Sequence, residues 1–275
     1  MAFRAPRFSY FNYTRLKYGD AAGNLTLGSG ESASASFPLS NVVDERDSVL
    51  FKFSTSYTNP SIIMNMDSTN GVNRLIIPAN HNVAEVFIEQ ADDITFVTNK
   101  ETLHASDSSP VPGTLYDSGE FDTLTQSRQY IRVTFIGTGT YELGELFYTD
   151  VMTFSAAPNL QNSSDEFKAN ATRLEHTTGA SPTIQHGPQQ RVIEYEYESP
   201  LSGTDLTNLE ALVAEVGMAF PFYIDPASFS TPPETDEPAL SVKFASMPRT
   251  RNSILVPSNG TRSKTFTLDL IEAVD

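Results

Sequence analysis

The sequence predicts an all-β fold, and three features of its 275 residues lead to that prediction. Short apolar segments rich in β-branched and aromatic residues recur along the chain, and several of them alternate with polar residues. Gly, Pro, Asn and Asp separate these segments, as they do at turns between strands. A content of 39% hydrophobic and 11% aromatic residues is enough for one large core or two ordinary ones.

Segments of the first half have the length and composition of strands, and their spacing is typical of a β-sandwich or jelly roll. They are residues 49–54, 61–66, 73–78, 84–90, 93–98, 129–137 and 142–150. We therefore expect a jelly roll over residues 25–154. An N-terminal arm, residues 1–24, precedes it, and its aromatic side chains can anchor a neighbouring subunit or pack back on their own domain: Phe3, Phe8, Tyr10, Phe11 and Tyr13.

The second half is predicted to be a smaller β domain with one packed helix. Residues 155–190 are polar and irregular, which indicates a linker, and the β domain follows over residues 191–275. Its first strand, RVIEYEYES, alternates aromatic or aliphatic residues with glutamates, and KTFTLDLIEA repeats the alternation near the end. Between them, residues 205–216 carry an apolar stripe at helical spacing, which Thr204 or Asp205 can cap and Gly217 ends.

Composition argues against several classes of function. The chain has 18 basic and 34 acidic residues, a formal charge of −16 and a pI of about 4.6, so it would repel a nucleic-acid backbone. Without cysteine there is no disulfide framework, thiolate metal site or cysteine nucleophile. No apolar run approaches the roughly 20 residues of a membrane span, and the N-terminal segment lacks an apolar leader pattern. We expect neither membrane insertion nor classical export.

No catalytic motif stands out, so we predict that the protein is not an enzyme. The pair His81-Asn82 lies between two apolar runs, where it can act chemically, as a base or metal ligand, or hold a turn. The remaining histidines, His104, His176 and His186, lie in polar segments without metal-type spacing, and we expect them to be solvated.

The first half resembles the discoidin or galactose-binding-like jelly roll over residues 25–152. Four motifs occur in the family's order, although Asn80 stands where the family has glycine and the early tryptophan is absent: Asn41 with Asp44, His81 with Asn82, Tyr130-Ile131-Arg132, and Gly144-Glu145. The resemblance implies a structural role for His81 and Asn82.

The same resemblance implies a calcium ion between an early acidic turn and a late glutamate, with Asp44, Asp47 and Glu145 supplying hard oxygen ligands. The other interpretation is a solvated turn with Glu145 paired to Arg46 or Arg132. No other cofactor is expected. Sugar binding in this fold uses aromatics and arginines on loops at one rim, for which the candidates are Tyr57, Phe121 and Arg128, without a pattern that gathers them.

The second half resembles small β domains of bacteriophage tail and baseplate proteins. This likeness implies a virion structural protein, such as a minor tail, tail-tip, baseplate or adaptor component, assembled in the host bacterial cytoplasm. Its partners would be other tail proteins and further copies of itself in a homo-oligomeric ring, with RVIEYEYES as an edge strand that pairs with a neighbour. The alternative is a carbohydrate-binding module, either lectin-like or a virion protein that binds a host glycan.

Overall fold

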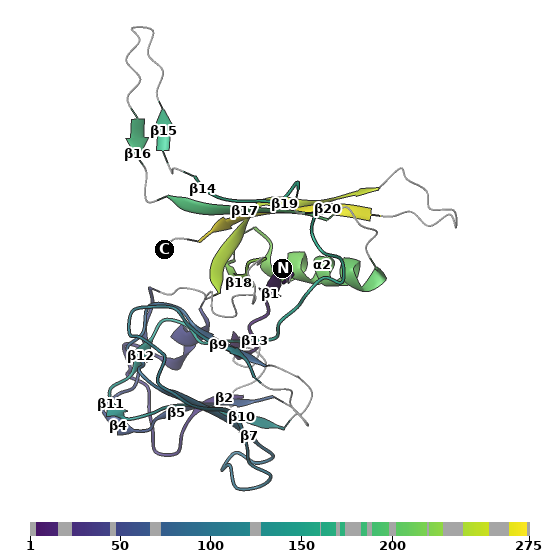
Figure 1. The fold of residues 1–275 in the computed structure, drawn as a ribbon. Helices are drawn as coiled ribbons and strands as arrows, with labels where there is room; N and C mark the ends of the chain where they lie inside the picture. Colours follow the sequence, from purple (N-terminus) through teal and green to yellow (C-terminus); the bar gives the residue numbers. More distant parts are fainter. Residues whose placement is uncertain are drawn as a thin grey trace. The chain divides into compact units, whose positions relative to one another are not determined.

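The computed structural model describes residues 4–15, 24–44, 48–66, 73–121, 128–159, 161–168, 171–173, 183–185, 189–197, 202–218, 220–227, 239–252 and 264–273. The chain forms two compact units: unit 1 comprises Met1–Tyr10 and Met152–Asp275, and unit 2 comprises Phe11–Val151. Strands dominate both units (Figure 1). The prediction of an all-β fold with one packed helix is therefore confirmed.

Unit 2 is a jelly-roll β-sandwich made of antiparallel strands. Its larger sheet has the order β2-β5-β10-β7-β8, a smaller sheet has the order β13-β6-β9, and two short ladders pair β12 with β3 and β11 with β4. The elements are β2 (Leu25–Leu27), η1 (Leu39–Val43), β3 (Phe51–Lys52), β4 (Tyr57–Thr58), β5 (Ser61–Asn65), β6 (Arg74–Ile77), β7 (Val86–Ala91), β8 (Glu101–Asp107), β9 (Tyr116–Glu120), β10 (Tyr130–Phe135), β11 (Thr138–Gly139), β12 (Glu142–Leu143) and β13 (Phe147–Thr149).

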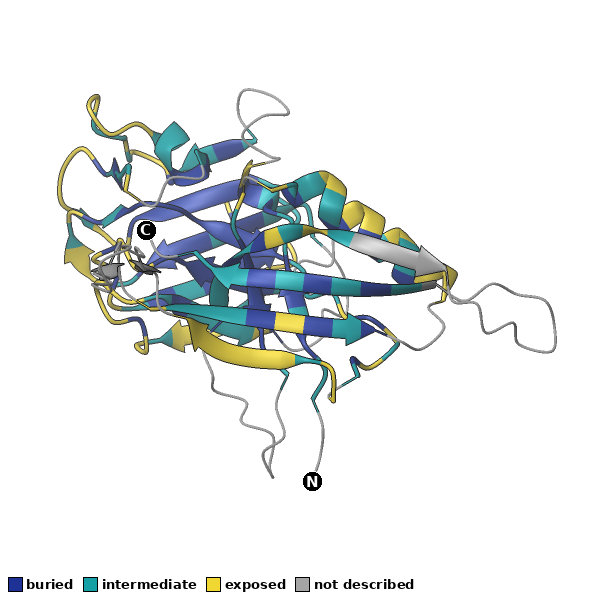
Figure 2. Cartoon of the chain, turned by 90° about the horizontal axis from the view of Figure 1, so that it is seen from above, coloured by how far each residue is buried: buried dark blue, intermediate teal, exposed yellow. Residues whose placement is uncertain are grey.

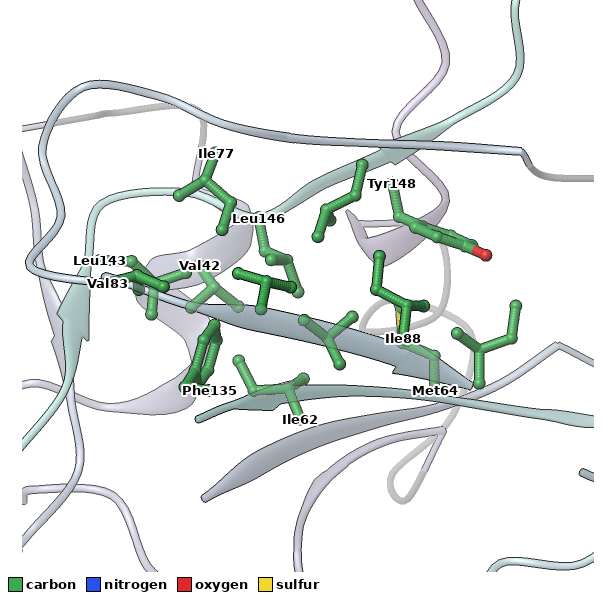
Figure 3. Packing of buried hydrophobic residues seen from close by; sticks show 14 of the residues in the cluster. Val42, Ile62, Met64, Ile77, Val83, Ile88, Phe135, Leu143, Leu146 and Tyr148 are labelled. Carbon is green, nitrogen blue, oxygen red and sulfur yellow. The ribbon is translucent and has the colours of Figure 1, made fainter. Parts of the chain in front are cut away.

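The core of unit 2 is filled by side chains from both sheets (Figure 3). Along β10, Ile131, Val133 and Phe135 alternate toward it, as the period of a strand requires. Ile88 of β7 and Tyr148 of β13 belong to the same cluster. Burying one such side chain contributes about 1.5–3 kcal/mol, so this cluster is the main source of stability in the unit.

Unit 1 is a six-stranded antiparallel sheet with helix α2 packed on one face. The order of its strands is β1-β18-β19-β20-β17-β14, and buried residues alternate with more exposed ones along β17 and β20 (Figure 2). Side chains of α2 share one core cluster with the alternate residues of β17 and β20. The elements are β1 (Arg7–Ser9), β14 (Ser164–Lys168), β15 (Ala171–Arg173), β16 (Thr183–Gln185), β17 (Gln190–Tyr197), α2 (Gly203–Val216), β18 (Phe222–Asp225), β19 (Leu240–Asn252) and β20 (Lys264–Glu272).

The structure divides the chain at other positions than the predicted boundaries. Arg7–Ser9, in the predicted arm, pairs with β18 of unit 1, whereas the chain from Phe11 belongs to unit 2. Unit 2 is thus inserted between β1 and Met152. Arg7 and its ion-pair partner Asp225 are 218 positions apart, and a local sequence pattern carries no information about so distant a pairing.

Two strand predictions for unit 2 need correction, and two strands were not predicted. Residues 93–98 form a loop, because the Asp93 carboxylate accepts hydrogen bonds from the N–H groups of Thr95, Val97 and Thr98. Strands β8 and β9 were not expected, because their sequences, ETLHASD and YDSGE, are polar. Residues 142–150 form two short strands, β12 and β13, that belong to different sheets.

Two predictions for unit 1 also differ from the structure. The expected edge strand, β17, lies between β20 and β14, so it is an interior strand. The outer neighbour of β17 is β14, which lies in the segment that was predicted to be a linker. This strand was missed because its sequence, SDEFK, has one apolar residue and therefore no strand signal. Neighbouring strands decide which edge stays open, and local sequence does not.

Helix α2 begins two residues before the predicted segment. Ser202 is the N-cap: its hydroxyl accepts from the Asp205 N–H, and the Asp205 carboxylate accepts from the Ser202 N–H, which forms a capping box. Leu209, Leu212 and Val216 are buried as predicted. None of the helices that the structure describes is long and apolar enough to span a membrane.

Candidate functional site

His81 and Asn82 are tied to the backbone of other segments. The His81 Nε2 atom lies 2.8 Å from the Thr114 carbonyl oxygen, and the Val83 N–H donates to Nδ1 at 3.1 Å. The Asn82 amide donates to the Thr140 carbonyl at 3.0 Å and accepts from the Glu142 N–H at 2.9 Å. These are the side-chain-to-backbone bonds of a turn-holding pair.

The surroundings of His81 favour the neutral imidazole. Burial lowers the pKa of His81 from its ordinary value, although its two backbone partners, Thr114 and Val83, act in the opposite direction. Because Nδ1 accepts a hydrogen bond, the ring proton lies on Nε2 and is donated to the Thr114 carbonyl. Both ring nitrogens are engaged, so His81 presents neither a lone pair to a metal nor a base to a substrate.

The acidic residues proposed for calcium are not assembled in the described part of the chain. Asp44 is the C-cap of η1, and Asp47 lies outside the described residues. The buried Glu145 carboxylate accepts from the Asn12 amide at 3.1 Å. Within the described residues, no group of three His, Cys, Asp or Glu side chains is placed to hold a metal ion. The calcium site therefore stays a prediction.

Of the two arginines predicted as alternative ion-pair partners of Glu145, the structure describes one. Arg46 lies outside the described residues, whereas the Arg132 guanidinium forms an ion pair with Glu89 and stacks on the Phe96 ring at 4.1 Å from its centroid. Arg132 thus belongs to the cluster on β7 and β10.

The three predicted glycan-binding candidates have separate surroundings. The Tyr57 hydroxyl bonds with Ser32 and Ser54. The Phe121 ring is buried, with its centroid 5.5 Å from that of His104. Arg128 Nη1 lies 3.3 Å from an Asp92 carboxylate oxygen. The contacts of these three side chains do not join them into one site.

A different group of side chains gathers on the outside of unit 2. The turn Ser34–Phe37 docks on β3: the Ser34 N–H donates to the Lys52 carbonyl, and the Lys52 N–H donates to the Phe37 carbonyl. On the other side of β3, Lys52 lies opposite Glu142 of β12. Since Phe51 and Leu143 are buried, the alternation of the strands turns Lys52 and Glu142 outward.

We call Phe37, Lys52 and Glu142 the Phe37 patch. The Lys52 ammonium forms an ion pair with the Glu142 carboxylate and lies 4.7 Å from the centroid of the Phe37 ring. The Phe37 side chain is 36% exposed, and the two charged side chains are 29% and 32% exposed. The patch therefore presents part of an aromatic ring, a hydrogen-bond donor and an acceptor to solvent.

Three hydroxyl groups lie near this patch in the chain. Ser54 follows Lys52 by two residues, just beyond the end of β3, and its Oγ lies 2.7 Å from Ser32 Oγ and 3.1 Å from the Tyr57 hydroxyl. Hydrogen bonds with Ser32 and Ser54 lower the pKa of Tyr57. The hydroxyls extend the surface that can exchange hydrogen bonds with a polar ligand.

Sequence reasoning selected Tyr57 from this region and missed the Phe37 patch. One usable signal was present: in FKF and YEL, a charged residue stands between two apolar ones, which marks Lys52 and Glu142 as outward-facing. The pairing of the two strands was not visible, and Phe37 had no distinguishing pattern.

One histidine departs from the prediction that it is solvated. His104 is 22% exposed, and its Nε2 lies 3.2 Å from the Asp107 carboxylate and 3.3 Å from the Tyr116 hydroxyl. Burial and the neighbouring Asp107 raise the pKa of Tyr116 well above its ordinary value. These side chains tie β8 to β9. His176 and His186 lie outside the described residues.

Comparison with known proteins gives structural likenesses. No protein-family model and no curated protein matches the chain. The chitosan-binding module 1 of a chitosanase/glucanase from Paenibacillus sp. IK-5 is 22% identical, with a TM-score of 0.35, covering 46% of this chain and 93% of the module. A family 32 carbohydrate-binding module from a family 31 glycoside hydrolase of Clostridium perfringens is 17% identical, with a TM-score of 0.37, covering 48% and 99%.

A third solved structure is the family 32 module of NanJ from C. perfringens in complex with galactose. It is 13% identical, with a TM-score of 0.37, and the match covers 52% of this chain and 99% of the module. At these identities the likeness concerns the fold.

Proposed function

We propose that this chain binds carbohydrate through unit 2, at the Phe37 patch. The observation that carries the proposal is an exposed phenylalanine ring held beside an outward-facing lysine–glutamate pair, Lys52 and Glu142, on the surface of the jelly roll. The proposed activity is binding, without bond cleavage.

The chemistry of a sugar matches this combination of groups. A pyranose ring has an apolar C–H face, which an aromatic ring can cover, and a rim of hydroxyls that both donate and accept hydrogen bonds. Lys52 can donate and Glu142 can accept, and hydrogen bonds to charged groups are stronger than those between neutral groups. The hydroxyls of Ser32, Ser54 and Tyr57 offer further partners.

The patch is also held in place before any ligand arrives. The Asn82 side chain fixes the backbone on both sides of Tyr141 through Thr140 and Glu142, and the ladder of β3 and β12 fixes Lys52 against Glu142. Fixing these groups in the free protein reduces the entropy lost on binding. The His81-Asn82 turn therefore supports the proposed site without contacting the ligand.

A glycan array with the labelled chain, with and without calcium, tests the proposal first. Saturation-transfer NMR with the methyl glycosides of galactose, glucose and N-acetylglucosamine follows. We expect Phe37→Ala, Lys52→Met and Glu142→Gln each to weaken binding about tenfold, the effect of losing one hydrogen bond to a charged group or one aromatic contact. Val111→Ala removes another exposed apolar side chain of unit 2 and should leave binding unchanged.

Unchanged melting temperatures of the three variants would separate a lost contact from a lost fold. An array without binding in either condition, or binding that all three variants retain, would contradict the proposal.

A second candidate function is the virion structural role that the sequence resemblance implies. The observation that favours it is the solvent-exposed edge strand β14, a feature that suits assembly with another chain. Mass spectrometry of purified phage particles from the source host tests this role. Absence of the chain from every particle would reject it and leave the carbohydrate proposal untouched.

A further inference from the structure

We infer that two copies of this chain form a symmetric dimer through strand β14 of unit 1, which extends the sheet from one copy into the next. All five residues of β14, Ser164–Lys168, are exposed, and the strand is the last in the order of the sheet (Figure 1). An exposed edge strand presents unpaired N–H and C=O groups to another strand. This interface is separate from the proposed sugar site in unit 2.

The opposite edge of the sheet is closed. Phe8, in the centre of β1, gives its N–H to the Met152 carbonyl and accepts from the Met152 N–H, both at 2.8 Å. Both backbone groups of Phe8 therefore point away from β18 and are already paired. Head-to-tail pairing needs two different open edges, and the β1 edge cannot supply the second.

Part of β19 also extends beyond β18, but this stretch is protected. It carries Pro248, which has no N–H, and its ladder with β20 has register shifts between Phe244 and Ser246 and between Ser246 and Arg249. Proline and bulges are the usual obstacles to edge pairing. Strand β14 contains no proline, and its ladder with β17 is regular. Among the edges of this six-stranded sheet, the suitable partner for β14 is therefore a second β14.

The hydrogen bonds of β17 show which groups of β14 point outward. The Arg191 N–H donates to Glu272 of β20, and the Glu196 N–H donates to Ser163 beside β14. Even-numbered residues of β17 therefore point toward β14 and bond to its even-numbered residues. The N–H and C=O groups of Asp165 and Phe167 consequently point away from β17, toward a second copy.

Symmetry limits the register of such a dimer. Antiparallel pairing about a two-fold axis perpendicular to the sheet places one residue opposite its own copy, so the centre is Asp165, Glu166 or Phe167. The first two centres place like carboxylates opposite each other, which is destabilising. The third places Phe167 opposite Phe167.

Charge complementarity favours the register centred on Phe167. In that register Glu166 of each copy lies opposite Lys168 of the other, which gives two cross-strand ion pairs on one face of the extended sheet and the aromatic pair on the other face. Within one strand Glu166 and Lys168 already lie 2.9 Å apart and are 53% and 57% exposed, so both remain accessible to a second copy. Phe167 is 66% exposed, and pairing would cover it.

Charge-reversal variants test this interface. The association of the full chain is measured by light scattering and sedimentation over a range of concentrations. We expect a concentration-dependent dimer for the natural sequence. Glu166→Lys and Lys168→Glu, each alone, place like charges opposite each other twice and should weaken the dimer about tenfold or more. The double variant exchanges the charges and should restore it. A monomer at every concentration, a larger ring, or a dimer unaffected by either single change would overturn the inference.

Disulfide trapping provides an independent test, because the chain has no cysteine of its own. In the Phe167-centred register the two Cα atoms at position 167 lie about 5.5 Å apart, within the range of a disulfide, so oxidised Phe167→Cys should run as a dimer on a non-reducing gel. Ser164→Cys is the matched control. Its two copies lie about 20 Å apart in this register and should not cross-link. Efficient cross-linking of the control, or none at position 167, would reject the register.

Discussion

The capping carboxylate of helix α2 gives the sharpest prediction for unit 1. Asp205 is 1% exposed and accepts from the Ser155 N–H at 2.7 Å, the Ser155 hydroxyl at 2.5 Å and the Ser202 N–H at 3.2 Å. It thus joins the start of the helix to the segment that follows Met152. We predict that Asp205→Ala is the most damaging single change of a polar residue on this helix.

The magnitude follows from these contacts. Loss of the capping box costs about 1 kcal/mol, and loss of the bonds from Ser155 costs about 1–2 kcal/mol more, because Ser155 is exposed and water can replace its partner. A total of about 2–3 kcal/mol corresponds to a fall of about 6–12 °C in the melting temperature of a unit of about 130 residues.

The pH dependence of this effect identifies the carboxylate as its source. Burial would raise the pKa of Asp205, but the hydrogen bonds from Ser155 and Ser202 outweigh burial and leave the pKa below its ordinary value of 3.8. The stabilisation is therefore complete above pH 3.8 and is lost as the pH falls through the lowered pKa. The difference between the natural chain and Asp205→Ala should shrink accordingly.

Differential scanning calorimetry of the intact chain, with hydrogen exchange of the α2 amides, measures both effects. Glu210→Gln, an exposed acidic position on the same helix, is the matched control and should change the melting temperature little. The reasoning fails if Asp205→Ala costs no more than Glu210→Gln, or if its cost persists in acid.

Three further predictions concern unit 2, each read from its melting temperature. Burial lowers the pKa of His81, so its stabilisation is complete above pH 6.5 and is lost in acid; His81→Gln should remove this part of the pH dependence. Asp117→Ala removes a carboxylate that pairs with the buried Arg74 guanidinium and should cost about 3 kcal/mol. Burial raises the pKa of Asp150 despite a hydrogen bond from Tyr13, so the charged carboxylate destabilises unit 2 at neutral pH. Asp150→Asn should therefore raise the melting temperature at neutral pH, and the difference from the natural chain should disappear toward pH 4.

Controls for these variants come from the same unit. Thr102→Ala, at an exposed position of β8, should change stability by no more than about 0.5 kcal/mol. A melting curve of His81→Gln with the natural acid dependence, an Asp117→Ala variant as stable as Thr102→Ala, or an Asp150→Asn variant less stable at neutral pH would each contradict the corresponding argument.

Alternation predicted the strands of the core because burial there follows local sequence. In β10 and β17 every second residue is apolar, and these residues are the buried ones. The same reasoning failed where hydrogen bonds to polar side chains determine the conformation of the backbone. Residues 93–98 have the composition of a strand, but three N–H bonds to the Asp93 carboxylate fold them into a loop, in which Phe96 adopts a φ of 56°.

The candidate site was less predictable than the fold because its members come from separate segments. The resemblance to a jelly roll directed attention to His81 and Asn82, but three of the four bonds of this pair reach residues 33 to 60 positions away, which local sequence does not show. Lys52 and Glu142 meet only because β3 pairs with β12, a contact that depends on the whole sandwich. Sequence alone shows that each faces outward, and not that they face each other.

Three phenylalanines, Phe37, Phe53 and Phe167, illustrate why local sequence alone does not show which aromatic residues are available for function. Phe37 and Phe53 each lie close to Lys52 in the structure, yet Phe53 is buried and Phe37 is exposed, because only Phe53 faces the core between the sheets. Phe167 is exposed for another reason, since its strand lies at the edge of the sheet. Beside the Phe37 ring stand a lysine and a glutamate, whereas the pair Glu166–Lys168 lies on the opposite face of its strand from Phe167. An isolated exposed aromatic residue needs no explanation, but a ring flanked by a complementary charge pair supports a specific interaction that mutation of the charges can test.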